Sequence, residues 1–181
     1  MAEDKKAGGL DNNQEEKYVR PSWDEYFMEM AKTASKRATC DRGRSGSIAA
    51  KDNQLLVTGY VGAPKGFPDC DEVGHLMKKV DHGDGTVSNH CVRTIHAEQN
   101  LICQAAKRGV SLEGATVYCR MVPCVVCCML LVNCGIKRVV AERHYHQGGV
   151  DVLKEAGIQL DVLYEDEVQA YKGMTEKNNY G

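Results

Sequence analysis

Two short clusters in the sequence contain residue types that bind a transition metal. The first is H-A-E at 96–98, and the second is P-C-V-V-C at 123–127. Each stands at the start of an expected helix, and the two cysteines are three positions apart, so both sulfur atoms can face one point. Unpaired N–H groups and the helix dipole favour thiolates there. The pattern predicts a metal site formed by His96, Cys124 and Cys127.

Glu98 adds a carboxylate beside this expected site. Three protein ligands leave a tetrahedral zinc ion one open position, as in catalytic rather than structural sites. Zinc can lower the pKa of a water molecule to about 7, and Glu98 can carry protons to a substrate nitrogen. Alone, the C-x-x-C motif is equally compatible with core or redox cysteines, and an isolated H-x-E carries almost no information. Together, H-x-E and P-C-x-x-C are typical of zinc deaminases, with Glu98 as the catalytic proton carrier.

The elements that must position these residues follow from periodicity and turn signals. Strands that alternate with helices predict an α/β sandwich whose second half is largely parallel. We expect one domain over residues 20–172, with flexible tails at 1–19 and 173–181. The expected helices are 21–37, 95–108, 123–134, 150–156 and a short one from Asp166; the expected strands are 47–50, 55–61, 115–120, 138–141 and 159–163. Residues 62–93 show little periodicity, which is typical of a functional or externally anchored segment.

Composition limits the classes of partner. The chain has 181 residues, a formal net charge of -2 and a pI of about 6.3, so it lacks the basic surface expected of a nucleic-acid-binding protein. It has no apolar run long enough to span a membrane, and its polar N-terminus does not resemble a signal peptide, so we expect neither a membrane span nor a secretory leader. We therefore expect a cytoplasmic protein with reduced cysteines that acts on a small charged substrate.

Five motifs support a more specific assignment. They are K-R-A-T-C at 36–40, T-G-Y-V-G-A-P at 58–64, C-V-R-T-I-H-A-E-Q-N at 91–100, P-C-V-V-C at 123–127 and N-C-G-I at 133–136. From about Trp23 to Tyr164 the chain resembles the deoxycytidylate (dCMP) deaminases of the cytidine/deoxycytidylate deaminase superfamily.

The resemblance implies a fold, a reaction and an assembly. The fold would be a three-layer α/β/α cytidine-deaminase-like sandwich with a five-stranded mixed sheet. The reaction would be zinc-dependent hydrolysis of dCMP to dUMP and ammonia, which supplies thymidylate synthesis. The protein would be a homo-oligomer, with a hexamer favoured, and its effectors would be dCTP as activator and dTTP as inhibitor.

One residue departs from the family pattern. The family usually has an asparagine that binds the substrate sugar where this chain has Val61, and a valine side chain cannot form a hydrogen bond. Either the backbone of Gly62 or a shifted loop replaces that contact, or the substrate has changed. Substrate contacts are expected from Val61, Gly62, Ala97 and Tyr145, and the cations considered for a phosphate are Lys65, Arg93 and Arg120.

The remaining cysteines fall into two groups. Some members of the resembled family carry a second, structural zinc, and Cys40, Cys70 and Cys91 could bind one here with His75 or His90 as the fourth ligand. Such a metal would anchor the 62–93 segment; the alternative is that these side chains are simply solvated. The other group is expected to pack as small core residues, and its members are Cys103, Cys119, Cys128 and Cys134.

Two alternatives to dCMP deamination remain open. One is a zinc deaminase that acts on another cytosine nucleoside or nucleotide, or on a nucleobase. The other is a non-catalytic zinc-binding nucleotide sensor. Glu98 argues against the sensor, because only chemistry requires that carboxylate.

Overall fold

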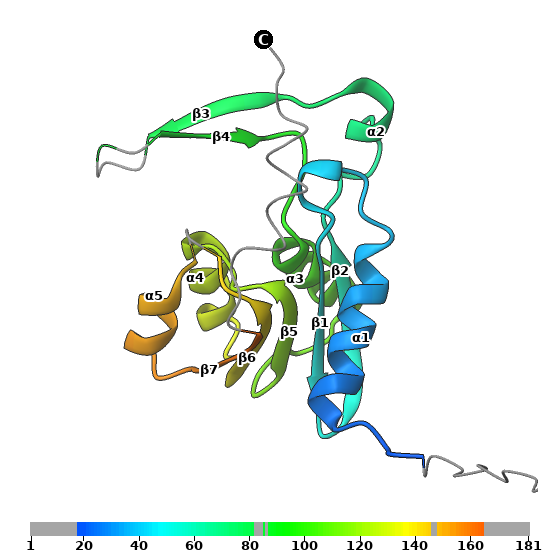
Figure 1. Cartoon of the computed structure of the whole chain (residues 1–181), viewed down its shortest axis with the longest axis vertical. Helices are drawn as coiled ribbons and strands as arrows, with labels where there is room; N and C mark the ends of the chain where they lie inside the picture. Colours follow the sequence, from blue (N-terminus) through cyan, green and yellow to red (C-terminus); the bar gives the residue numbers. More distant parts are fainter. Residues whose placement is uncertain (1–17, 82–84, 86, 146–147, 165–181) are drawn as a thin grey trace, which may run out of the picture.

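A computed structural model describes residues 18–81, 85, 87–145 and 148–164. Its centre is a five-stranded sheet in the order β2-β1-β5-β6-β7 (Figure 1). Strand β1 pairs antiparallel with β2 and β5, whereas β5, β6 and β7 run parallel. The strands are β1 Gly46–Lys51, β2 Gln54–Tyr60, β5 Thr116–Met121, β6 Arg138–Arg143 and β7 Gln159–Tyr164. The predicted five-stranded mixed sheet is confirmed.

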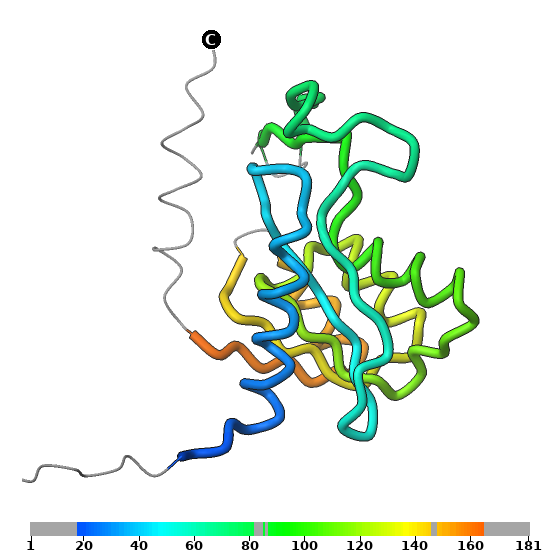
Figure 2. The backbone as a smooth tube through the Cα atoms, turned by 90° about the vertical axis from the view of Figure 1, so that its right-hand side faces the viewer, coloured from blue at the N-terminus to red at the C-terminus, as the bar shows by residue number. Residues whose placement is uncertain are grey.

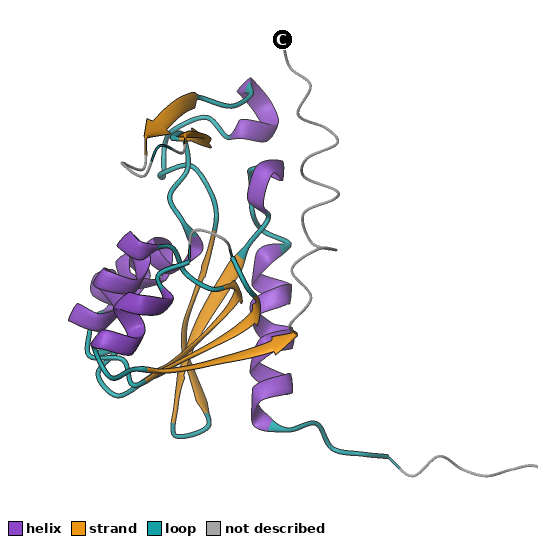
Figure 3. Cartoon of the chain, turned by 60° about the vertical axis from the view of Figure 1, so that its left-hand side comes forward, coloured by secondary structure: helices purple, strands orange, loops and turns teal. Residues whose placement is uncertain are grey.

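Helices cover both faces of this sheet (Figure 3). Helix α1 (Trp23–Ser35) lies alone on one face, and α3 (Ala97–Arg108), α4 (Val125–Asn133) and α5 (Val150–Glu155) lie on the other. Side chains alternate between the two faces, as the pleat of a strand requires. Tyr118 therefore packs in the core under α1, while its neighbour Val117 packs in the core under the other three helices. The three-layer α/β/α architecture is confirmed.

Local sequence explains where the elements begin and turn. Ser22 and Glu25 form a capping box that starts α1, which satisfies two helix-end donors reciprocally. Asp52 and Asn53 adopt φ angles of 50° and 59° between β1 and β2, the left-handed pair that a tight two-residue hairpin needs. Gly109 ends α3 at a φ of 67°, a conformation that glycine adopts without strain.

The segment between β2 and α3 contains more structure than the sequence predicts. It holds a short helix α2 (Cys70–Val73) and an antiparallel hairpin of β3 (Met77–Asp81) and β4 (Val87–Cys91). Figures 1 and 2 show that the hairpin projects away from the main sheet, and its strands pair only with each other among the described residues. Because neither face is buried against the core, the hairpin lacks the apolar alternation that identifies a strand in sequence.

The structure does not test the predictions made for the two ends of the chain. Most of the expected tail 1–19, all of the tail 173–181 and the helix expected from Asp166 lie outside the described residues. Among the described residues, no helix has both the length and the apolar character to cross a bilayer.

Candidate active site and second metal cluster

The structure brings the three predicted ligands together at two helix N-termini. His96 is the N-cap of α3, Cys124 is the N-cap of α4, and Cys127 lies in the first turn of α4. The His96 Nδ1 atom is 3.5 Å from the Sγ atom of Cys124 and 3.5 Å from that of Cys127. Tetrahedral zinc with ordinary Zn–N and Zn–S lengths places such atoms about 3.5 Å apart. The donor set therefore fits a zinc ion.

Hydrogen bonds within this cluster shift the proton affinities of its members. Hydrogen bonding to Cys127, and then to His96, lowers the pKa of Cys124 to about 4. The bond to Cys124 correspondingly raises the pKa of His96 and that of Cys127. Donors that share protons at this distance have lone pairs directed at one point, so a divalent cation can replace the protons.

Glu98 is the second residue of α3 and is only 6% exposed. Burial raises the pKa of its carboxyl, and the Cys127 side chain forms a hydrogen bond with it. A raised pKa brings a carboxyl closer to the working pH of a proton carrier. Glu98 thus lies beside the three donors without belonging to their set, as the sequence predicts for a catalytic acid–base group.

Residues at the start of α3 fix the helix to the end of β2. The Gln99 Oε1 atom accepts a hydrogen bond from the His96 N–H group at 3.0 Å. One turn further along, Asn100 Nδ2 donates to the Tyr60 carbonyl at 2.8 Å. A Cβ atom on Gly59 would lie 2.2 Å from the Ala97 carbonyl oxygen, so only glycine permits this approach. Asn100 lies within the motif at 91–100, but its position alone does not predict this contact.

The loop after β2 leaves few donors for a substrate. The Val61 N–H donates to the Ser45 carbonyl at 3.0 Å, and the Gly62 N–H donates to the Ile95 carbonyl at 3.4 Å. Neither backbone donor can bind a sugar hydroxyl without giving up its present bond. The Thr39 hydroxyl has no partner among the described residues and lies 3.2 Å from a Cβ atom built on Gly62. It is an unused polar group beside this loop that sequence reasoning missed.

The two other residues expected to contact the substrate, Ala97 and Tyr145, differ in their burial and in the elements around them. Ala97 is buried at the start of α3. Tyr145 is partly buried against the core, and its carbonyl accepts a hydrogen bond from Gly148, which forms a bridge to Cys124. The Tyr145 loop therefore lies next to a metal ligand.

The three candidate phosphate-binding cations separate in space. Arg120 forms a 2.7 Å ion pair with Glu142, which also meets Lys32 of α1, so Arg120 lies on the face of the sheet opposite α3 and α4. This placement agrees with the pleat of β5, because residues two apart on a strand lie on the same face and Tyr118 is on the face of α1. Arg93 Nε donates to the Gly74 carbonyl at 3.0 Å, and Lys65 is exposed.

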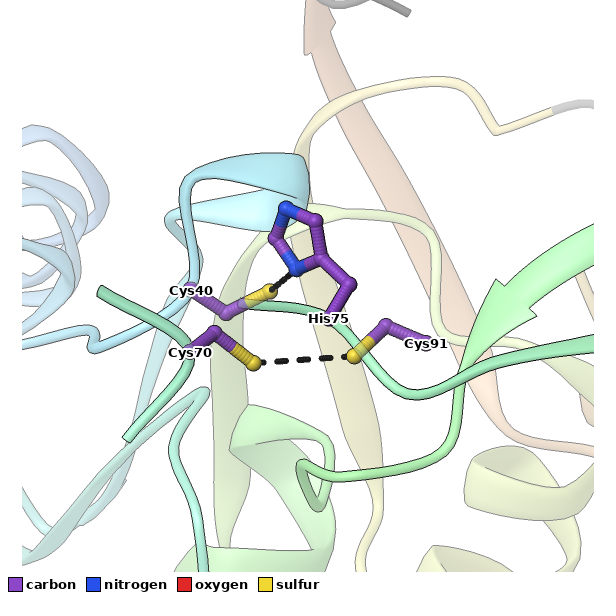
Figure 4. Close-up of side chains that lie close together, drawn as sticks. All are labelled: Cys40, Cys70, His75 and Cys91. Carbon is purple, nitrogen blue, oxygen red and sulfur yellow. Dashed lines mark hydrogen bonds between the residues drawn. The ribbon is translucent and has the colours of Figure 1, made fainter. Parts of the chain in front are cut away.

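A second cluster contains three cysteines and one histidine (Figure 4). The Cys40 Sγ atom lies 3.6 Å from His75 Nδ1, and the Sγ atoms of Cys70 and Cys91 are 3.6 Å apart. All four donor atoms lie within 4.8 Å of one another. Burial raises the pKa of Cys40 and of Cys70, so a cation is needed to hold them as thiolates. Four such donors match a closed structural zinc site.

The structure distinguishes the two histidines proposed for this cluster. His75 belongs to it, and its other ring nitrogen, Nε2, lies 3.0 Å from Asp41 Oδ1. A carboxylate on the second ring nitrogen is the usual partner of a metal-binding histidine. His90 Nε2 instead lies 2.6 Å from Ser88 Oγ on the same strand.

The four cysteines expected in the core differ in exposure. Cys119 and Cys128 are fully buried, and Cys134 is partly buried against the core. Cys103 is exposed, so that prediction is wrong. It lies on α3 between Leu101 and Ala105, which face the core, and therefore points outward.

Comparison with known proteins agrees with this geometry. The family model for the cytidine and deoxycytidylate deaminase zinc-binding region matches residues 21–143. The chain is 34% identical to ComE operon protein 2 of Bacillus subtilis over 151 residues, which cover 82% of this chain and 75% of that protein. It is 36% identical to the deoxycytidylate deaminase of Schizosaccharomyces pombe over 143 residues, 78% of this chain but only 44% of that protein.

A solved structure extends the likeness to the whole fold. The dCMP deaminase of cyanophage S-TIM5, crystallised with dCMP and dUMP, superposes with a TM-score of 0.64 and 28% sequence identity. The superposition covers 80% of this chain and 99% of that chain. With the family model matching more than half of the residues, the chain belongs to the cytidine and deoxycytidylate deaminase zinc-binding family.

Proposed function

We propose that the protein hydrolyses dCMP to dUMP and ammonia, with zinc held by His96, Cys124 and Cys127. The observation that carries this proposal is the buried Glu98 carboxyl beside three donors at zinc-site distances. When bound, the zinc supplies Lewis-acid activation of a water molecule.

The reaction requires Glu98 to move two protons. It accepts a proton from the attacking water and delivers it to the ring nitrogen N3. It then transfers the second water proton to the departing amino group, which leaves as ammonia while the water oxygen becomes the new carbonyl oxygen. Burial of Glu98 supports this role, because it raises the pKa of the carboxyl and excludes competing water.

Substrate contacts are proposed for Val61, Gly62, Ala97 and Tyr145. Their support is position: the loop of Val61 and Gly62 is bonded to Ile95, directly before His96, and the Tyr145 loop is bridged to Cys124. Val61 also keeps a second candidate open, a zinc deaminase of another cytosine nucleoside or nucleotide, or of a nucleobase. Loss of a hydrogen bond to the substrate sugar would alter which substrate the enzyme prefers.

The second cluster is proposed to hold a structural zinc through Cys40, Cys70, His75 and Cys91. The closed set of four donors and the Asp41 carboxylate on His75 support it. Because thiolate ligands need a reducing compartment, we also propose a cytoplasmic location. From the family resemblance we propose a homo-oligomer, with a hexamer favoured, that responds to dCTP and dTTP.

A substrate panel with zinc analysis on one preparation tests these assignments together. We expect dCMP to be turned over in preference to CMP, deoxycytidine, cytidine and guanine, by a protein with two zinc ions per chain. Turnover of another panel member without dCMP activity would reject dCMP as the substrate. One zinc per chain would reject the second metal site.

A further inference from the structure

Ser47 has a hydroxyl group that is completely buried and has no hydrogen-bond partner. Its side chain is 0% exposed. Within the described ranges, Ser47 Oγ and Thr39 Oγ1 are the two buried side-chain nitrogen or oxygen atoms that lack a partner. Proteins pair nearly all such groups, so each exception needs an explanation. Thr39 lies beside the loop after β2, whereas Ser47 lies on β1 and therefore places an unused donor inside the sheet.

The neighbours of Ser47 show which layer its hydroxyl faces. Ile48 packs in the core under α1, whereas Ala49 packs in the core under α3, α4 and α5. Successive side chains point to opposite faces of a strand, so Ser47, two residues before Ala49, faces these three helices. Ser47 is paired with Gly59 of β2 on one side and with Cys119 of β5 on the other. Residues paired in this way share a face of the sheet.

The first turn of α3 lies on these three paired residues. A Cβ atom on Gly59 would lie 2.2 Å from the Ala97 carbonyl oxygen, so the helix backbone touches the sheet on one side of Ser47. On the other side, burial and then the charge of Glu98 raise the pKa of the Cys119 thiol. Glu98 directly follows Ala97, and it therefore lies over the part of the sheet that contains the Ser47 hydroxyl.

Binding of zinc to Cys127 would remove one hydrogen bond of the Glu98 carboxyl. The partners of this carboxyl are its own backbone N–H and the Cys127 thiol, which donates to it. A thiolate that binds zinc has no proton to donate, and a buried carboxylate that loses a donor is costly. The Ser47 hydroxyl is a donor on the same side of the sheet, and rotation about one bond redirects it.

We infer that Ser47 is a positioning residue of the active site, whose hydroxyl donates a hydrogen bond to the Glu98 carboxylate and holds it in the orientation for proton transfer. This role rests on the proposed function of Glu98 as proton carrier, but not on which aminated ring is the substrate. Because the hydroxyl comes from a central strand, it holds the carboxylate from the rigid part of the molecule, where small misplacements are avoided.

A crystal structure and steady-state kinetics of the zinc-loaded full chain test this contact. The crystal structure should place Ser47 Oγ about 2.5–3.0 Å from a Glu98 carboxylate oxygen. Ser47→Ala should lower kcat for dCMP about tenfold and change KM less than about twofold, because the carboxylate loses its orientation while substrate binding keeps its contacts. Zinc content and Tm should stay close to those of the wild type.

Ser35→Ala is the matched control. It removes another buried serine hydroxyl, which donates to the Lys32 carbonyl on α1 in the opposite layer, and it should leave kcat unchanged. A wild-type kcat in Ser47→Ala would overturn the positioning role. A distance beyond about 3.5 Å between Ser47 Oγ and both Glu98 carboxylate oxygens would overturn it as well.

A double-mutant cycle shows whether Ser47 acts through Glu98. In a Glu98→Gln background, Ser47→Ala should lower kcat by less than about twofold, because the group that it positions is already disabled. An equal loss in both backgrounds would overturn the inferred contact. If dCMP is not turned over, the same cycle on the panel substrate that is turned over rejects dCMP and still tests Ser47. A Glu98→Gln variant with normal kcat would reject the proposed mechanism and the role of Ser47 together.

Discussion

The two candidate metal clusters use similar donor residues in different frameworks. The catalytic cluster has three donors at the N-termini of α3 and α4, which pack on the central sheet, and a buried carboxyl stands beside them. The second cluster has four donors, and it joins loops to a hairpin that lies away from the sheet. A rigid site with an open position serves chemistry, whereas a closed site replaces the core that a projecting segment lacks.

The largest expected effect distinguishes chemistry from metal binding at the first cluster. Glu98→Gln should reduce kcat on the order of 10³-fold, because the amide cannot carry protons, while both zinc ions are retained. Steady-state kinetics and zinc analysis on one sample measure this. Glu113→Gln, at an exposed residue, provides the control, and a Glu98 variant with normal kcat would remove Glu98 from the mechanism.

Loss of a ligand at the second cluster should affect stability instead. Cys70→Ser should remove one of two zinc ions and destabilise the fold by several kcal/mol, because metal binding contributes to folding free energy. For a chain of this size that corresponds to a fall in Tm of about 10 °C. The exposed Cys103→Ser is the matched control. An unchanged Tm with two zinc ions would show that the cluster holds no structural metal.

A smaller effect is expected where the end of β2 is held against the catalytic helix. Asn100→Ala removes the 2.8 Å bond to the Tyr60 carbonyl and frees the loop of Val61 and Gly62 to move relative to Glu98. We expect kcat/KM for dCMP to fall about 10- to 100-fold with zinc content unchanged, because small misplacements are costly. Gln104→Ala, which loses only a 3.3 Å hydrogen bond to Asn100, should lower kcat/KM less. Equal effects would contradict the positioning role.

The smallest expected effect is on stability, at an ion pair between α1 and the central sheet that lies outside both candidate metal clusters. Asp24 accepts hydrogen bonds from Tyr118 and Arg138, and the Arg138 bond lowers the pKa of Asp24 below its ordinary 3.8, against the opposing effect of burial. The stabilisation is complete above the ordinary value and is lost as the pH falls through the lower folded-state pKa.

Asp24→Asn should therefore cost about 1 kcal/mol at neutral pH, a modest amount because the pair is partly exposed and screened. Thermal unfolding curves of the variant and the wild type should converge in strong acid. Zinc content should stay the same at neutral pH. A constant difference at every pH would show that ionisation of Asp24 is not the cause.

The sequence predicts the catalytic cluster better than the second one for a physical reason. The Cys124 and Cys127 spacing is local, so helical geometry alone brings the sulfur atoms together. The second cluster joins positions from 40 to 91, and only the tertiary fold selects His75 over His90 and places Asp41 behind it. The five-stranded mixed sheet is implied by the family resemblance, but the hairpin is not predicted because its strands have no face buried against the core.

If the second cluster holds the proposed zinc, the projecting hairpin would link the lifetime of the protein to metal supply. An isolated two-stranded ribbon is only marginally stable in water, and here its attachments are the four donors together with bonds such as Arg42 to the Asn89 carbonyl. Without the proposed zinc, we expect this segment to open before the sheet does, which would expose its backbone to proteases. A chain without its second metal would be degraded from this arm even while the catalytic helices remain folded.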